Sequence, residues 1–192
     1  MIHSALRLLT FHRIRITFFV MAGLIALYWA EGRHPYRLLD TETPYGPLGV
    51  VLVLAGVFLR AWAAGVVHKN EELATSGPYS LTRHPLYVGS FTIAVGVFVV
   101  LGDLRGATVL LLLFLLLYLP KIRWEEDTLR GRYGAAWDAY CARTALVGPR
   151  TLRPSLRTTW SVRRWVANGE YRALVTALVV LGVLELLARG LD

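Results

Sequence analysis

The sequence is poor in the residues that build disulfide frameworks and metal sites. Cysteine occurs once, at Cys141, which excludes an internal disulfide. No HExxH, no CxxC and no comparable spacing of ligands is present, so we expect no metal cofactor. The chain also lacks a GxGxxG after a strand, a P-loop and a GxSxG turn. Their absence excludes the common soluble designs for nucleotide binding and acyl transfer.

Acidic residues are scarce as well, with 13 Asp and Glu against 21 Lys and Arg and a formal net charge of +8. Hydrophobic residues make up 55% of the 192 residues, and they gather in runs instead of following amphipathic spacing. Such runs predict an all-α, polytopic membrane helical bundle that forms one integral-membrane domain over residues 1–192. About five transmembrane helices are expected, over Ile14–Ala30, Pro47–Val67, Pro85–Leu101, Gly106–Leu119 and Ala173–Ala188.

The basic residues are distributed unevenly over this topology. If the N-terminus is cytosolic, 17 of the 21 Lys and Arg residues lie in cytosolic segments, and the exceptions are Arg33, Arg37, Arg105 and Arg189. The positive-inside rule therefore predicts that the N-terminus and the long polar segments face the cytosol. Basic residues there meet anionic lipid headgroups, so the charge indicates a membrane partner and argues against nucleic acid.

Two long polar segments, 68–84 and 121–172, are separated by two predicted spans and so lie on the same side of the membrane. We expect those two spans to form a helical hairpin with a cofactor pocket at its cytosolic end. In the stretch SGPYSLTRHPLYVG, the Gly-Pro pair marks a turn, and Pro85 suits the first turn of a helix, which places His84 at the N-cap. Arg83, His84 and the positive helix end predict a receptor for a carboxylate or phosphate. The alternative is simple contact with lipid headgroups.

The second polar segment begins with a predicted helix over Lys121–Arg143. At about 100° per residue, one stripe of this helix collects apolar and aromatic side chains, namely Ile122, Leu129, Tyr133, Ala136, Trp137 and Tyr140. Glu126 falls inside the stripe and Glu125 at its edge, and a carboxylate on an apolar face requires a partner. We expect Glu126 to be the more buried acid and to point into the pocket, whereas Glu125 pairs with Lys121. The alternative is a solvated helix on which both glutamates form surface pairs.

The stretch SGPYSLTRHPLYVG, the hairpin, RWEEDTLRGRYGAAWDAY and a nearby VGP together resemble an integral-membrane methyltransferase family. This family includes isoprenylcysteine carboxyl methyltransferases and phospholipid N-methyltransferases. The resemblance covers a methyltransferase core at residues 59–149, and residues 150–192 form a C-terminal extension with the last span. It implies methyl transfer from S-adenosylmethionine to a lipophilic acceptor at the membrane surface, such as a prenylcysteine-type carboxylate or a phospholipid amine. The first span and the extension have no clear match in characterised eukaryotic members, so the resemblance does not select the acceptor.

Carried over residue by residue, the resemblance implies that seven residues bind the cofactor: Tyr79, Arg83, His84, Tyr87, Gly89, Glu125 and Glu126. Arg83 and His84 suit the methionine carboxylate, a glutamate suits the ribose hydroxyls or the ammonium group, and aromatic faces suit the sulfonium. Arg60 and Arg123 are the candidate catalytic residues, as groups that hold an acidic acceptor. A carboxylate or thiolate acceptor needs no general base, whereas an amine does, and no residue stands out as that base.

Two other functions fit parts of the same pattern. A membrane reductase of the sterol-reductase type has a similar RxPxYxG and YGxxWxxY arrangement but binds NADPH, and YGAAWDAY matches it. His84 directly before Pro85, together with the acidic pair, favours the methyltransferase. The other alternative is a lipid-binding membrane protein that keeps the fold without catalysis.

Overall fold

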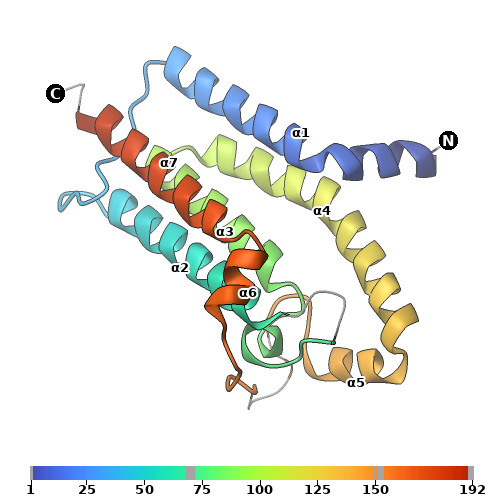
Figure 1. Cartoon of the computed structure of the whole chain (residues 1–192). Coiled ribbons are helices and arrows are strands. Elements are labelled where there is room, and N and C mark those ends of the chain that lie inside the picture. The colour runs from blue at the N-terminus through green and yellow to red at the C-terminus, as the bar shows by residue number, and fades with distance from the viewer. Residues whose placement is uncertain (1, 68–71, 149, 151–153, 190–192) are drawn as a thin grey trace.

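The computed structural model describes residues 2–67, 72–148, 150 and 154–189, and for residues 2–14 it describes the backbone alone. The start of the first polar segment, residues 68–71, therefore lies outside the described residues. The elements in this part of the chain are all helical (Figure 1): α1 (Ile2–Ala30), α2 (Tyr45–Val66), the 3₁₀-helix η1 (Gly77–Ser80), α3 (Pro85–Leu101), α4 (Leu104–Tyr133), α5 (Ala135–Arg143), α6 (Val162–Ala167) and α7 (Tyr171–Arg189).

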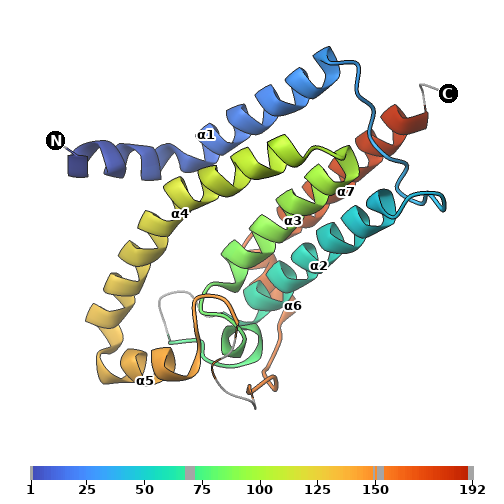
Figure 2. The same cartoon turned by 180° about the vertical axis from the view of Figure 1, so that it is seen from behind.

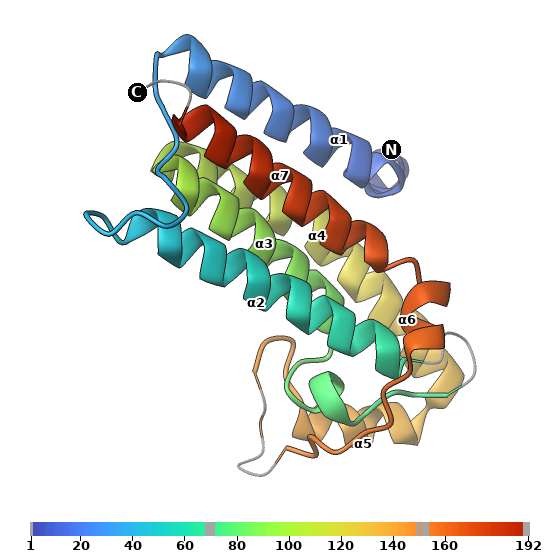
Figure 3. The ribbon, with the colours of Figure 1, turned by 60° about the vertical axis from the view of Figure 1, so that its left-hand side comes forward.

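Each of the five predicted apolar runs lies in a helix, except for Val67, which caps α2. Within the described residues, three helices, α2, α4 and α7, are long and apolar enough to cross a membrane, and Arg15–Ala30 of α1 and the whole of α3 are shorter apolar helices. Figure 3 shows α1, α2, α3 and α7 running roughly parallel to one axis. The predicted all-α membrane bundle is therefore confirmed. α3, with 17 residues, is at the lower limit of about 17 residues for a spanning helix.

Helices α2 and α3 pack antiparallel, and glycines let their backbones approach closely. A Cβ atom at Gly89 would lie 2.8 Å from the Gly56 carbonyl oxygen, and one at Gly96 would lie 2.7 Å from the Gly49 carbonyl oxygen. Small residues drive helix contact of this kind in membranes, where lipid is as apolar as the side chains. The core around this pair collects buried side chains from α2, α3, α4 and α7, including Val53, Val57, Val97, Phe98, Leu101, Leu110, Leu181 and Leu184.

Helix α4 is longer than the predicted fourth span, because it continues through Pro120 to Tyr133. The prediction of one helix over Lys121–Arg143 is wrong at Gly134, which has a positive φ of 50° and separates α4 from α5. Glycine adopts such a backbone without the steric cost that a Cβ atom imposes. Figure 2 shows the C-terminal half of α4 diverging from α3, with α5 crossing below the gap between them. The end of the bundle at which α2 ends and α3 begins is called the site end below.

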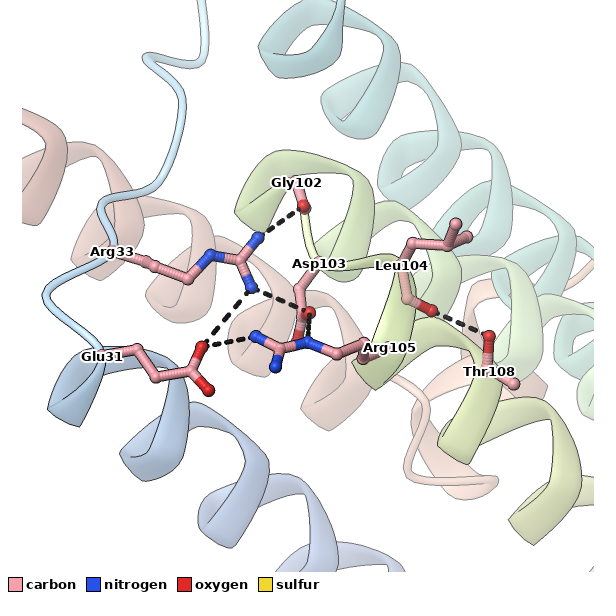
Figure 4. Close-up of polar contacts among 7 residues, drawn as sticks. All are labelled: Glu31, Arg33, Gly102, Asp103, Leu104, Arg105 and Thr108. Atoms are coloured by element: carbon pink, nitrogen blue, oxygen red, sulfur yellow. Dashed lines mark hydrogen bonds and ion pairs between the residues drawn. The ribbon is translucent and has the colours of Figure 1, made fainter.

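A charged cluster holds the opposite end together (Figure 4). Arg33 donates to the Asp103 carboxylate at 3.0 Å and to the Gly102 carbonyl at 2.8 Å, and Arg105 pairs with Glu31. These contacts join the segment after α1 to the turn between α3 and α4. Two of the four basic residues expected on the side away from the site, Arg33 and Arg105, therefore lie at the end opposite the site end.

Candidate functional site

The loop that leads into α3 is held in place by the segment that follows α4. The Tyr140 hydroxyl of α5 donates to the Tyr79 carbonyl at 2.7 Å, and the Arg83 amide donates to the Ala145 carbonyl at 3.1 Å. The Thr82 hydroxyl donates to the Leu146 carbonyl. These contacts add to the internal backbone hydrogen bonds of η1 and tie the loop to the segment after α4, so they help to decide where its side chains point.

The predicted helix start is confirmed, with His84 at the N-cap of α3 and Pro85 at the first helical position. His84 Nε2 lies 3.1 Å from Glu126 Oε1, and Arg83 Nε lies 2.8 Å from the same oxygen. The Nε–H of Arg83 is not aimed along a hydrogen bond, so this contact is an ion pair. Arg83 also donates to the Thr144 carbonyl at 3.3 Å. Glu126 thus has the partners that a carboxylate on an apolar helix face requires.

The geometry gives His84 a defined protonation state. Burial lowers the pKa of His84, although the hydrogen bond and the charge of Glu126 act in the opposite direction. The imidazole is therefore neutral near pH 7. Since a carboxylate only accepts hydrogen bonds, Nε2 carries the proton and Nδ1 is left as an acceptor.

This arrangement changes the expected anion receptor. Glu126 already neutralises the charge of Arg83, and neutral His84 adds no positive charge. The pair was expected to receive a carboxylate or phosphate, but the protein's own carboxylate occupies that position. The pairing of Arg83 with Glu126 was not predicted from the sequence, because the Arg83–His84 motif and the acidic pair were considered as separate groups.

The two glutamates have different surroundings. Glu125 accepts a hydrogen bond from the Tyr87 hydroxyl at 2.8 Å and pairs with Lys121 at 3.4 Å. Glu126 is the more buried of the two, with 24% of its side chain exposed against 32% for Glu125, as the stripe predicts. The expectation that Glu126 points into the pocket is wrong, because Glu125 lines the cavity and Glu126 lies behind Arg83 and His84.

A cavity of about 410 Å³ occupies the space between the first turn of α3, the C-terminal half of α4 and α5. This volume is within the range of about 300–1,000 Å³ that is typical of small-molecule sites. Its walls are formed by Val67, Glu72, Leu73, Ala74, Tyr79, Arg83, His84, Pro85, Leu86, Tyr87, Trp124, Glu125, Thr128, Leu129, Arg132, Tyr133, Trp137 and Tyr140. Five of the seven residues that the resemblance implied for the cofactor are therefore brought together in one cavity: Tyr79, Arg83, His84, Tyr87 and Glu125.

Four cavity residues, Leu129, Tyr133, Trp137 and Tyr140, belong to the aromatic stripe but were not assigned to the site from the sequence. Their spacing could have assigned them to the site, because the stripe that contains Glu126 was expected to face the pocket. Burial raises the pKa of Tyr79 and of Tyr140 well above the usual value. Both phenols therefore stay protonated near neutral pH, and neither acts as a base.

The remaining predicted residues lie outside the cavity. Gly89 faces α2, where a Cβ atom would lie 2.7 Å from Arg60 Cγ, so its place in the motif is explained by helix packing. Arg123 is exposed on α4. The Arg60 guanidinium forms a paired contact with Glu170, at 2.9 Å from Nε and 2.8 Å from Nη2. No group of three or more His, Cys, Asp or Glu side chains that suits a metal ion occurs within the described ranges.

Comparisons with known proteins give the site a family context. The model of the phospholipid methyltransferase family matches residues 47–136, which include most of α2, the loop before α3, the hairpin and both glutamates. A nickel-cobalt-cadmium resistance protein of Alcaligenes xylosoxydans xylosoxydans is 37% identical over 74% of this chain and 67% of its own length. A cobalt-zinc-cadmium resistance protein of Cupriavidus metallidurans is 36% identical over 80% of this chain and 71% of its own length.

A more distant relative carries the name of an enzyme. The protein-S-isoprenylcysteine O-methyltransferase of Schizosaccharomyces pombe is 30% identical over 46% of this chain and 38% of its own length. No solved structure matches the chain.

Proposed function

This chain belongs to the integral-membrane methyltransferase family that includes phospholipid and isoprenylcysteine methyltransferases, and we propose that it transfers a methyl group from S-adenosylmethionine to a lipophilic acceptor at the membrane surface. The observation that carries the proposal is the cavity at the site end of the α3–α4 hairpin. It brings together the first turn of α3, Glu125 and a ring of aromatic side chains. The names of two relatives describe metal resistance and specify no reaction, so the proposal rests on the family and on this cavity.

The side chains of the cavity fit the chemical groups of the cofactor. Because Glu126 already pairs with Arg83, the positive N-terminal end of α3, where Pro85, Leu86 and Tyr87 line the cavity, is the group that suits the methionine carboxylate. Glu125 supplies an acceptor for the ammonium group or the ribose hydroxyls, and Nδ1 of neutral His84 supplies a second acceptor. The faces of Tyr79 and Tyr87 suit a sulfonium, because the face of an aromatic ring is negative.

When bound, S-adenosylmethionine supplies an activated methyl group on a positively charged sulfur. The chain's own contribution is position, because an in-line displacement gains much of its rate from alignment of the reacting atoms. The hydrogen bond from Tyr87 to Glu125 restricts the ring at the cavity wall, and the nearly fully buried Trp137 helps to exclude water. Since Tyr79 and Tyr140 stay protonated and His84 is a weakened base, the cavity favours an acceptor that is already anionic, such as a carboxylate or thiolate.

Equilibrium binding to detergent-purified protein tests the proposal directly. Isothermal titration calorimetry with S-adenosylmethionine, S-adenosylhomocysteine and NADPH is expected to show binding of the first two only. Transfer of a radiolabelled methyl group to components of a lipid extract then tests the reaction. Phase extraction of the labelled product shows whether the acceptor is a lipid or a water-soluble molecule. Binding of NADPH without S-adenosylmethionine would replace the methyltransferase with the reductase alternative. Absence of any cofactor binding by folded protein would favour the lipid-binding alternative.

A further inference from the structure

A partly buried ion pair connects the C-terminal extension to the wall of the cavity. Arg60 of α2 and Glu170, which precedes α7, have 20% and 10% of their side chains exposed. The contact is bidentate, because Nε of Arg60 lies 2.9 Å from one carboxylate oxygen and Nη2 lies 2.8 Å from the other. A planar guanidinium held in this way has a fixed orientation, and a pair with this little exposure to water is costly to break by removing one partner.

The third nitrogen of Arg60 reaches the first turn of α3. Nη1 donates to the Leu86 carbonyl at 3.1 Å and also contacts the Ser90 hydroxyl, which itself donates to the Leu86 carbonyl at 2.8 Å. The stem of Arg60 passes beside Gly89, where a side chain would overlap it. Leu86 lines the cavity, but Arg60 and Glu170 do not. Arg60 thus fixes the cavity wall from behind.

Glu170 is itself fixed by the segment before it. Trp160 Nε1 donates to the Ala61 carbonyl at 3.0 Å, the Ser161 amide donates to the Gly65 carbonyl at 3.0 Å, and the Asn168 side chain donates to the Ala64 carbonyl at 2.8 Å. The contacts to the Ala64 and Gly65 carbonyls satisfy groups at the end of α2 that the helix itself leaves without donors. The extension is therefore bound to the last turns of α2, and Glu170 enters the bundle from there.

The geometry points to Glu170 as a positioning residue for the cavity, acting through Arg60 on the first turn of α3, and this inference rests on the proposed function. Its charge also acts on the cavity more directly, because Glu170 adds to the effect of burial in raising the pKa of Tyr79. No described residue beyond Tyr140 lines the cavity, so the extension influences the cavity through contacts behind the wall. The same contacts show why Arg60, expected to hold an acidic acceptor, is instead engaged by Glu170.

Glu170→Gln removes the charge and keeps the shape, and Glu170→Asp keeps the charge. Glu185→Gln is the matched control on α7, because Glu185 also forms an ion pair, with Arg189 at 2.6 Å, but lies at the opposite end of the bundle. We expect Glu170→Gln to weaken binding of S-adenosylmethionine by on the order of tenfold, the middle of the range for residues that couple to a site without touching its ligand. Glu170→Asp should recover part of that loss, and Glu185→Gln should bind as the wild type does.

Hydrogen–deuterium exchange without ligand gives a readout that does not depend on the proposed function. Glu170→Gln should increase exchange in peptides that cover residues 79–90 and leave α4 unchanged, whereas a general loss of stability would increase exchange throughout. Wild-type protein that fails to bind the cofactor would refute the proposed function, and the exchange data would then decide the positioning role alone. Local exchange and cofactor affinity that both match the wild type in folded Glu170→Gln protein would overturn the inference.

Discussion

The different surroundings of the two adjacent glutamates predict that their removal has different consequences. Glu125 lines the cavity and is held by Tyr87, whereas Glu126 lies behind it and compensates Arg83. Glu125→Gln and Glu126→Gln each replace one carboxylate oxygen with an NH2 group and keep the shape of the side chain. We expect Glu125→Gln to reduce cofactor affinity and Glu126→Gln to reduce stability.

The sizes of both effects follow from the contacts. Loss of a hydrogen bond to a charged group costs about 1.5–3 kcal/mol, so Glu125→Gln should raise the Kd of S-adenosylmethionine roughly 10- to 150-fold. Removing one partner of a buried pair costs about 3–5 kcal/mol. Because Glu126 keeps 24% of its side chain exposed, about 2–3 kcal/mol is a better expectation for Glu126→Gln. Its effect on affinity should be below about threefold, since Glu126 does not line the cavity.

Calorimetric titration of the cofactor and thermal unfolding in detergent measure the two effects on the same preparations. Glu126→Gln should lower the apparent Tm by on the order of 5 °C, with a smaller change for Glu125→Gln. Tyr87→Phe is a further control, because it removes the hydroxyl that orients Glu125 but leaves its charge in place. A larger loss of affinity for Glu126→Gln than for Glu125→Gln, at equal Tm, would refute this assignment of the two carboxylates.

Three further outcomes are expected. The unfolded form of His84 gains a proton near its usual pKa of 6.5 and the folded form gains it only at lower pH, so the protein should lose stability as pH falls below 6.5. In His84→Gln, the unfolding midpoint should depend less on pH below 6.5 than it does in the wild type. An unchanged pH dependence would assign the loss of stability to other groups. Gly89→Ala should lower the apparent Tm by the equivalent of about 1–3 kcal/mol through overlap with α2. Gly182→Ala on α7 meets nothing within 4 Å and should have no such effect. In a cysteine-free background, cysteines placed at Thr75 and Arg150 should be labelled from the cytosolic side, and labelling from opposite sides would exclude a shared site.

Much of the fold and part of the site were predictable because they depend on local pattern. The apolar runs are continuous, and a spanning segment in lipid must satisfy its own backbone, so helices were the expected outcome. The N-cap position of His84 followed from Pro85, whose missing N–H is tolerated in the first turn of a helix. The stripe on the predicted helix after Pro120 identified Glu126 as the more buried carboxylate, since helical spacing alone orders residues around an axis.

The end of α4 was not predictable from the same periodicity. Gly134 lies between two segments whose side chains continue one stripe, so the sequence reads as a single helix there. The positive φ of Gly134 divides them, and α5 contributes Trp137 and Tyr140 to the wall of the cavity. A lone glycine inside a helical pattern is compatible with either outcome, and packing against the loop before α3 decides between them.

By itself the sequence determined the class of protein, the positions of the apolar helices and the residue types available for chemistry, because these depend on composition and on spacing within one element. Only the tertiary structure decided which charges meet. Contacts such as Arg83 with Glu126 and Arg60 with Glu170 join residues 43 and 110 positions apart. Whether a cation is available to a ligand or is already compensated depends on those distances. The first pair therefore turned an expected anion receptor into a neutral wall, and the second turned an expected substrate ligand into a support for α3.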